Sequence, residues 1–471
     1  MSMMKGFSNA FRIPGLRKKI FITLGLVVVC RLISQIPTPG VNWEALSALM
    51  AKLAERASSD TAGNVFGWFE TFTGGGLSQC AVGTLSIWPY ISAQIVIQLL
   101  SSVIPSLEKL KKEGENGRQQ LAQITRYLTI GLCVFQAWSI ATLLLNPTML
   151  GEQVARLMQE SGVTSLVSAG NVPMFYFMTV ICMTAASLFV MWVADQITTF
   201  GIGNGASLII MINITSRLPS ALHYVWVTYF GEQAGSNGHT YPELILLVAF
   251  FLLVVMGTVM LTQGVRKIAI HSTRRSVGGG NTYGMQQTFM PLRVNYAGVM
   301  PIIFAQPIIQ VLGWILSHVT KDGAIHQFGE RLSMMSGPSY LIIYAVLILF
   351  FTFFWVATQF NAIDISDNLK KDGSYIPGIR PGRATAEYLD DAMTKITLIG
   401  GTGLLFIALV PMILTSTIVE SWSAASFFGG TSLLIIVGVA LDTLRIMESH
   451  LLVRKYEGFL SHGTLHGRGG M

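Results

Sequence analysis

Residues 173–194 read PMFYFMTVICMTAASLFVMWVA, a run without a single charged side chain. A helix of about 20 residues rises ~30 Å, which is the thickness of the hydrocarbon core of a bilayer. Nine further apolar stretches of similar length occur, near 20–36, 82–104, 124–145, 203–219, 242–262, 296–317, 340–360, 396–416 and 428–448. The sequence therefore predicts an all-α polytopic membrane protein with ten transmembrane helices.

The composition excludes a soluble protein, because 51% of the residues are hydrophobic and only 12% are charged. The basic residues before the first stretch resemble the start of a signal peptide, but the apolar run is long, contains Arg31 and lacks a small-residue cleavage site. We therefore expect an uncleaved first span. The cysteines at 30, 80, 133 and 182 are not at metal-ligand spacing, and no metal or other cofactor is expected.

The distribution of Lys and Arg predicts the orientation, because cytoplasmic segments retain these residues. Basic residues concentrate in 1–19, in the connections near 109–118, 263–295 and 361–395, and in the tail 450–471. The alternate connections carry few, and acidic residues offset those. Both termini are therefore predicted in the cytoplasm. Two sets of five spans, 20–225 and 226–449, would have opposite topology, as in inverted repeats that enclose a central path.

Several segments do not fit ordinary spans or ordinary loops. Residues 41–58 have the spacing of a short amphipathic helix on the outer face. The sequence FGWFETFTGGGLSQ at 66–79 is apolar but too short to span, so it is either an interfacial loop or a re-entrant piece that implies an internal cavity. The long cytoplasmic loops 263–295 and 361–395 either report orientation alone or dock a large partner, including RNA.

Motifs for enzyme chemistry are missing from the sequence. HExxH, GxSxG and GxxxxGK[ST] do not occur, and no span carries paired His or carboxylate clusters, so we do not expect an enzyme. Arg31 is the main ionisable residue predicted within a span, and the deeper polar groups are amides, chiefly Gln98, Asn213 and Asn295. A coupled transporter generally needs midplane charges, so this class is disfavoured.

Six motifs together resemble one family over about residues 12–468. They are SIWPYISAQIVIQLL (86–100), KKEGENGRQQLAQITRY (111–127), MWVADQITTFGIGNGASLII (191–210), PLRVNYAGVMPIIFAQ (291–306), SDNLKKDGSYIPGIRPG (366–382) and FFGGTSLLIIVG (427–438). In this order they resemble the SecY family, the central subunits of bacterial protein-conducting channels. The resemblance implies two inverted five-helix halves around an hourglass pore, with a lateral opening between the second and seventh spans.

The resemblance also assigns site residues. FETFTGGGLS at 69–78 is similar to the family's plug, a short helix in the outer funnel, and the assigned plug residues are Phe72, Thr73, Gly74, Gly75, Gly76 and Leu77. An aliphatic pore ring would comprise Ile87, Ile91, Ile202, Ile210, Ile303 and Ile435. Such a ring would disfavour water and ions yet fit around a passing chain. Ala206 departs from the family, which usually has a bulky aliphatic residue there.

For the lateral gate, the resemblance assigns Gln98, Thr125 and Asn295. Facing amides would hydrogen-bond for roughly 1 kcal/mol, weak enough for a signal helix to displace. The contacts with the motor ATPase SecA and the ribosome would be Arg266, Lys267, Arg274, Arg275, Lys370, Lys371 and Arg380. Two departures stand out: the loop tip VGGGN replaces an expected arginine pair, and Ser86 replaces a common glycine.

The function that this resemblance implies is a passive channel in the bacterial cytoplasmic membrane. Unfolded secretory precursors with signal sequences would cross it, and apolar segments would leave sideways into the lipid bilayer. The implied partners are SecE-like and SecG-like small subunits, SecA, and the ribosome with its RNA. Two alternatives stay open, namely a secondary transporter of a small solute and an insertion or scaffold protein without a pore.

Overall fold

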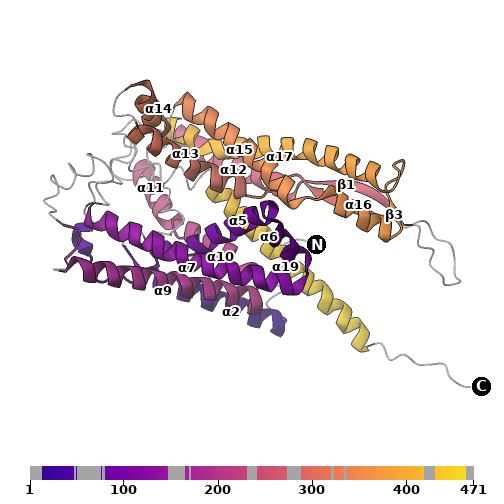
Figure 1. Ribbon diagram of the computed structural model, residues 1–471, viewed down its shortest axis with the longest axis horizontal. Coiled ribbons are helices and arrows are strands. Elements are labelled where there is room, and N and C mark those ends of the chain that lie inside the picture. The colour runs from indigo at the N-terminus through magenta and orange to yellow at the C-terminus, as the bar shows by residue number, and fades with distance from the viewer. Residues whose placement is uncertain are drawn as a thin grey trace, which may run out of the picture. The chain divides into compact units, whose positions relative to one another are not determined.

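The computed structural model describes residues 13–46, 49, 76, 80–146, 165–168, 171–230, 241–272, 288–319, 323–333, 337–417 and 430–462. In these ranges the chain is mostly helical, with one small sheet (Figure 1). It forms two compact units. Unit 1 comprises 1–55, 68–219 and 439–471, and unit 2 comprises 56–67 and 220–438.

Unit 1 is built from long helices and one short 3-10 turn. Its elements are α2 (Pro14–Ile33), η1 (Val82–Leu85), α5 (Trp88–Val103), α6 (Pro105–Lys112), α7 (Glu115–Leu145), α9 (Val172–Phe200), α10 (Gly205–Thr215) and the part of α19 (Thr431–His462) that follows Gly438. Proline stands in the first turn of four of them, α2, α5, α6 and α9, where its fixed φ suits a helix start and its missing N–H leaves nothing unpaired.

The helices of unit 1 pack closely along α9, which lies against α2, α7 and α10. Small side chains make this possible, because Ala186, Ser187 and Ala194 of α9 are all buried. At Gly205 the approach is especially close: a Cβ atom there would lie 2.0 Å from the carbonyl oxygen of Ala194. Only glycine fits at this contact between α9 and α10.

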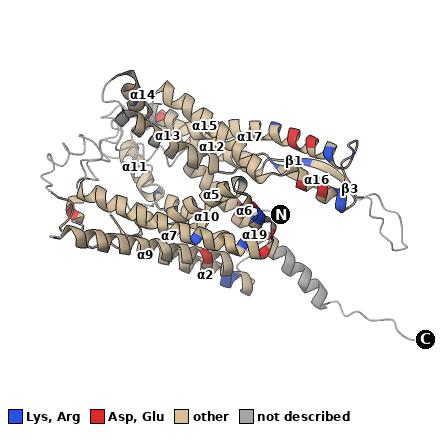
Figure 2. Cartoon of the chain, viewed as in Figure 1, with Lys and Arg blue, Asp and Glu red and all other residues tan. Residues whose placement is uncertain are grey.

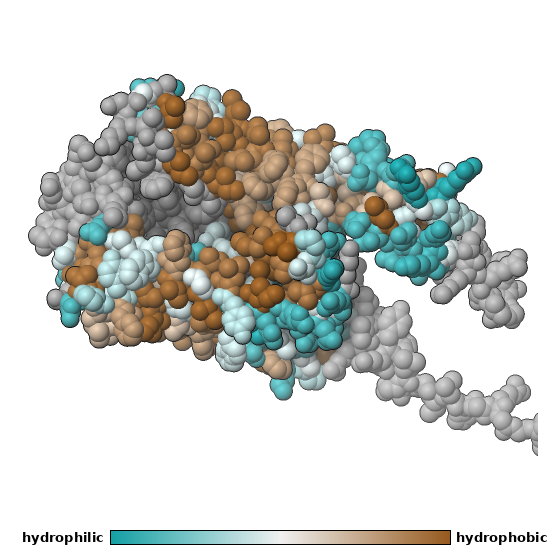
Figure 3. All heavy atoms as spheres, in the orientation of Figure 1, coloured by the Kyte–Doolittle hydropathy of each residue, from teal (hydrophilic) through white to brown (hydrophobic). Residues whose placement is uncertain are grey.

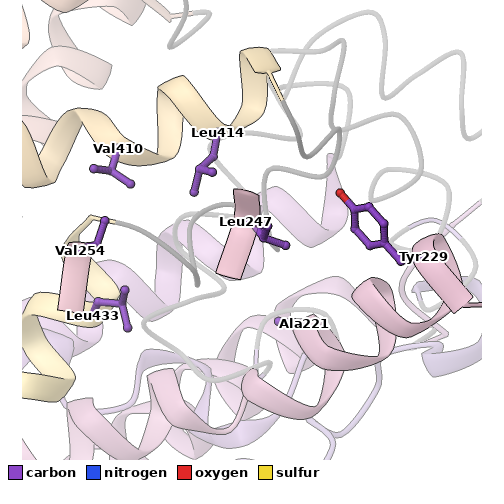
Figure 4. Close-up of a cluster of buried hydrophobic side chains, with 7 residues drawn as sticks. All are labelled: Ala221, Tyr229, Leu247, Val254, Val410, Leu414 and Leu433. Carbon is purple, nitrogen blue, oxygen red and sulfur yellow. The ribbon is translucent and has the colours of Figure 1, made fainter. Parts of the chain in front are cut away.

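Unit 2 contains the remaining helices and the sheet. Its elements are α11 (Leu218–Phe230) from Ser220 onward, α12 (Tyr241–Gln263), β1 (Val265–Ser272), β2 (Thr288–Arg293), α13 (Met300–Val319), α14 (Ala324–Ser333), α15 (Pro338–Gln359), α16 (Ala362–Lys371), β3 (Ser374–Tyr375), α17 (Arg383–Thr417) and the start of α19. A buried cluster joins α11, α12, α17 and α19 (Figure 4), formed by Ala221, Tyr229, Leu247, Val254, Val410, Leu414 and Leu433.

The sheet has the strand order β2-β1-β3, and both pairings are antiparallel. Its register pairs Val265 with Arg293 at one end of β1 and His271 with Tyr375 at the other. Strands β1 and β2 come from the predicted loop 263–295, and β3 comes from the predicted loop 361–395. The two loops are therefore joined by backbone hydrogen bonds.

The helix surfaces expose apolar side chains as lipid-facing surfaces do. On α12, for example, Ile245, Leu252 and Met260 are each more than 60% exposed. In unit 2, Figure 3 shows hydrophobic side chains over α13 and α15 and hydrophilic ones over α16, β3 and the start of α17. A soluble protein would not leave such continuous apolar areas in water.

Seven described helical segments are long and apolar enough to cross a membrane. They correspond to predicted spans two to six, eight and nine, while α2, α13 and α19 overlap the predicted first, seventh and tenth spans. The boundaries differ in two cases, because α7 and α17 begin at Glu115 and Arg383, well before the apolar stretches at 124 and 396. Their polar first turns extend the helices beyond the hydrocarbon core.

Two predicted spans differ in detail. Helix α2 ends at Ile33, so Arg31 lies in its last turn. In the predicted span 203–219, α10 ends at Thr215 and α11 begins at Leu218, and the segment Gly205–Phe230 as a whole is long and apolar enough to cross a membrane. The predicted amphipathic helix 41–58 begins at Trp43, and beyond Leu46 nearly all of it lies outside the described residues.

Candidate functional site

The segment that precedes α5 is unusual in its backbone. Cys80 and Ser86 have φ angles of 42° and 47°, and among the described residues they are the only ones other than glycine with positive φ. These two residues flank η1. The dihedrals of Ser86 (47°, −135°) and Ile87 (−92°, 0°) match the two central positions of a type II′ turn, whose first position favours glycine. Ser86 is therefore strained.

Hydrogen bonds to α9 and α10 hold Ser86 in this conformation. Its Oγ accepts a 2.9 Å hydrogen bond from Nδ2 of Asn213 in α10. Its carbonyl oxygen accepts a 2.8 Å hydrogen bond from Oγ of Ser187 in α9. The thiol of Cys133 in α7 donates to Ser187 Oγ at 3.4 Å. Two helices, α9 and α10, thus bond directly to one buried turn residue, and α7 bonds to Ser187.

Two residues of the predicted pore ring follow directly. Ile87 is the N-cap of α5, and the Ile91 amide donates a 3.1 Å hydrogen bond to the Ile87 carbonyl. The two side chains are four residues apart and so lie on one face of the helix. Both are buried.

The connection between α9 and α10 carries Ile202, a third predicted ring residue. Its amide donates to Oγ1 of Thr23 in α2 at 3.1 Å, and its side chain packs against Leu16 and Met447. Ile210 lies in α10, partly buried.

The remaining two ring residues lie in unit 2. Ile303 is in the first turns of α13 and Ile435 is in the first turns of α19, and both are buried. Neighbouring residues are buried as well, namely Ile302 and Ala305 near Ile303, and Leu434 beside Ile435. The six residues are thus divided between the units, four in unit 1 and two in unit 2.

The predicted gate residues are divided in the same way. Gln98 lies in α5 and Thr125 in α7, two helices that pack together in unit 1. Thr125 is buried, and its hydroxyl donates to the Leu121 carbonyl of its own helix at 2.8 Å. Asn295 was expected on the seventh span but lies five residues before α13, in the segment after β2. Its Oδ1 atom is buried and finds no hydrogen-bond partner within the described part of the chain.

The predicted plug lies almost entirely outside the described residues. Gly76 is the exception, and its carbonyl oxygen accepts hydrogen bonds from the Ala81 amide and the Thr84 hydroxyl, both at 2.9 Å. Gly76 is thereby tied to η1, directly before the strained turn.

The predicted contact residues of the two long loops, 263–295 and 361–395, are exposed where they are described. Arg266 and Lys267 lie on β1, Lys370 and Lys371 end α16, and Arg380 lies between β3 and α17. Figure 2 shows charged residues on α16 and on the start of α17. Arg274, Arg275 and the tip VGGGN lie outside the described residues.

The sheet was not predicted from the sequence, although the sequence contains a strand pattern and a turn pattern. In VRKIAIHS the buried Ile268 and Ile270 alternate with less buried neighbours, which is a strand pattern, and the Gly-rich VGGGN is typical of a hairpin turn. The rings of His271 and Tyr375 pack edge to face, with their centroids 5.9 Å apart. This adds a side-chain contact where β1 pairs with β3.

The chain between β3 and α17 is also held by local hydrogen bonds. The Thr385 hydroxyl donates to the Arg380 carbonyl at 2.9 Å, and the Ser366 hydroxyl donates to the Gly382 carbonyl at 2.7 Å. Pro377 and Pro381 restrict the backbone on either side of Arg380.

The described residues hold no group of three or more His, Cys, Asp or Glu side chains that could bind a metal ion.

Comparisons with known proteins agree with this architecture. Residues 81–444 match the family model for SecY. The protein translocase subunit SecY of Thermotoga maritima is 38% identical over 469 residues, which cover 99% of this chain and 100% of that protein.

Two solved structures share the fold. One is a SecY structure concerned with a plug domain that stabilises the closed state of the translocation channel and maintains a membrane seal; its TM-score is 0.56 at 16% identity, covering 93% of this chain and 92% of that chain. The other is Sec61 in the canine ribosome-channel complex from the endoplasmic reticulum, with a TM-score of 0.53 at 15% identity and 93% of each chain covered.

These matches confirm the predicted helical membrane fold. With a family model matching most of its length and a relative 38% identical from end to end, the chain belongs to the SecY family.

Proposed function

We propose that this chain is the central subunit of a protein-conducting channel, through which unfolded secretory precursors cross the membrane. The observation that carries the proposal is the match to a protein translocase subunit over the whole chain, on a fold of membrane-length helices. A channel subunit of this kind acts by shape and surface chemistry, so it needs no catalytic residues of its own.

The constriction of the channel is proposed to be the aliphatic ring predicted from the sequence, formed by Ile87, Ile91, Ile202, Ile210, Ile303 and Ile435. Five of the six are buried apolar side chains, the kind that an aliphatic constriction requires. An apolar constriction excludes hydrated ions by dewetting, while flexible side chains can surround a polypeptide in transit. Ala206 would leave extra room beside this ring.

We further propose that the two halves, 20–225 and 226–449, are inverted repeats that part at a lateral gate. Gln98 and Thr125 would line it on one side and Asn295 on the other. The buried Asn295 Oδ1, which lacks a hydrogen-bond partner in the described part of the chain, supports a polar role that a moving neighbour could satisfy. Residues 72–77 would form the plug, and Gly76 would anchor it to η1.

The sheet and its flanking loops are proposed as the docking face for cytoplasmic partners, with both termini on the same side. The exposed cations Arg266, Lys267, Lys370, Lys371 and Arg380 suit the acidic surface of a motor ATPase such as SecA or the phosphates of ribosomal RNA. Arg274 and Arg275 would belong to the same face. SecE-like and SecG-like small subunits complete the proposed assembly in the bacterial cytoplasmic membrane.

Reconstitution tests this function. The chain would be placed in proteoliposomes with its small subunits, SecA, ATP and a precursor, and protection of the precursor from external protease would be measured. Protection that requires this chain, ATP and an intact signal sequence supports the proposal. Protection at the level of liposomes without the chain would contradict it and favour a scaffold, whereas ATP-independent uptake of small solutes would favour a transporter.

A further inference from the structure

The structure carries one inference about the strained turn at Ser86, and it rests on the proposed channel function. We propose that the Asn213–Ser86 hydrogen bond is a positioning device for the constriction. It compensates for a serine at a position that glycine would occupy without strain, and thereby keeps Ile87 in place.

The backbone of Ser86 is strained. A φ angle of 47° is in the left-handed region, which side chains with a Cβ atom adopt only when the surroundings impose it. The residue that follows is Ile87, whose position depends directly on the Ser86 dihedrals. Any relaxation of Ser86 toward negative φ would move Ile87 and turn the start of α5.

Two hydrogen bonds impose this conformation on Ser86. Both polar atoms that Ser86 offers as acceptors are used: Oγ receives Asn213 Nδ2 at 2.9 Å, and the carbonyl receives Ser187 Oγ at 2.8 Å. Ser86 is 4% exposed and Asn213 is 3% exposed, so water does not compete for these groups. All partners belong to unit 1, and the restraint is therefore internal to one compact body.

The two hydrogen bonds reach different atoms of Ser86. The Ser187 bond reaches the main chain and survives any substitution at position 86. The Asn213 bond reaches the hydroxyl alone, and it is lost when either side chain changes. Without this bond, a residue with a Cβ atom at position 86 is still strained but is no longer held in its conformation. Glycine adopts the same dihedrals without strain, so its conformation does not depend on the bond.

Four variants should differ in ion conductance in a specific pattern. Ser86→Ala and Asn213→Leu should each raise the resting ion conductance of reconstituted channels by roughly two- to tenfold, the range that one buried hydrogen bond supplies. Ser86→Gly should seal like the wild type. Most sharply, the double variant Ser86→Gly/Asn213→Leu should also seal, because glycine removes the strain that Asn213 compensates.

The readouts are ion conductance at rest and translocation of two precursors, one with an intact signal sequence and one with a defective signal sequence. Ser86→Ala and Asn213→Leu should increase translocation of the defective precursor while the intact one still crosses. A purely structural role would instead lower both. Thr129→Val serves as the matched control, since it removes a buried hydroxyl that bonds only within α7, to Thr125 at 2.7 Å.

The outcomes are distinguishable. If the wild type fails to translocate the intact precursor, the proposed function fails. If the wild type translocates but Ser86→Ala and Asn213→Leu keep the wild-type conductance, or if Ser86→Gly fails to rescue Asn213→Leu, the positioning role is overturned. Equal loss of both precursors in all variants, at reduced channel yield, would overturn it too and assign the bond to folding alone.

Discussion

The hydroxyl of Ser366 donates a 2.7 Å hydrogen bond to the carbonyl of Gly382, sixteen residues further along the chain. The bond closes the base of the segment that carries Arg380, because Ser366 lies in α16 and Gly382 directly precedes α17. Ser366 is 2% exposed, so the bond is protected from water. The segment is therefore presented as a closed loop and not as a free strand.

Replacing Ser366 with Ala should loosen this loop. Loss of one buried hydrogen bond costs about 1 kcal/mol, and the Gly382 carbonyl would be left without that donor. We expect faster amide hydrogen exchange in residues 374–382 and unchanged exchange in β2, which pairs with β1 and not with β3, measured by mass spectrometry. Thr402→Val is the control, since its hydroxyl bonds only within α17. Unchanged exchange in 374–382 would contradict the closing role of Ser366.

A polar side chain in the proposed constriction should weaken the membrane seal. Ile303→Asn or Ile435→Asn would hydrate the ring, and both the resting ion conductance and the acceptance of precursors with poor signal sequences should rise. Ile303→Leu conserves volume and polarity and is expected to seal normally. Wild-type conductance and wild-type precursor selectivity in both asparagine variants would show that these residues do not form the ring.

The thiol of Cys80 should be inert at neutral pH. Burial raises its pKa to about 12, despite an opposing effect from Thr38, and its side chain is 1% exposed. Because the folded pKa lies above the ordinary value of 9.0, the folded state holds the proton and loses stability only as pH rises above that value.

Peptide mass spectrometry after maleimide treatment at pH 7.5 tests this. Cys80 should remain unlabelled in the folded protein and become labelled after denaturation, since only the thiolate reacts. A cysteine introduced at the exposed Ser449 should label at once and confirm that the reagent is active. Rapid labelling of native Cys80 would show that the segment around it opens far more often than this packing allows.

The ion pair between Arg126 and Asp195 should contribute little. Its atoms lie 2.9 Å apart between α7 and α9, but the side chains are 54% and 32% exposed. Exposed pairs of this kind are worth about 0–1 kcal/mol and weaken with salt. A double-mutant cycle with Arg126→Gln and Asp195→Asn, followed by thermal unfolding in detergent, should give a coupling energy in that range. A coupling above about 2 kcal/mol would assign the pair a larger role.

The membrane fold could be predicted because lipid constrains sequence strongly. A span such as 173–194 must be apolar over its whole length, and α9 accordingly runs from Val172 to Phe200. The helix ends were less predictable. Polar turns such as those at the start of α17 continue a helix outside the bilayer, where hydropathy no longer reports on it.

The site was predictable only in part, because its geometry depends on contacts between distant residues. The isoleucines are ordinary apolar residues in any periodicity analysis. The strain at Ser86 is visible only in its dihedrals, and its partner Asn213 stood out in the sequence merely as an amide within a span. The sheet that joins the two long loops was not predicted, because β3 is two residues long and is defined by its pairing with β1.

The most direct test of the channel is site-specific photo-crosslinking to a precursor stalled in transit. A photoreactive residue would be placed at Ile91 in α5 and at Ile435 in α19, with Leu253 of α12, which is 60% exposed on the apolar surface, as the control. Crosslinks at both isoleucines and none at Leu253 are the predicted result. A demonstrably stalled precursor that crosslinks at neither isoleucine would contradict the proposed path through the constriction.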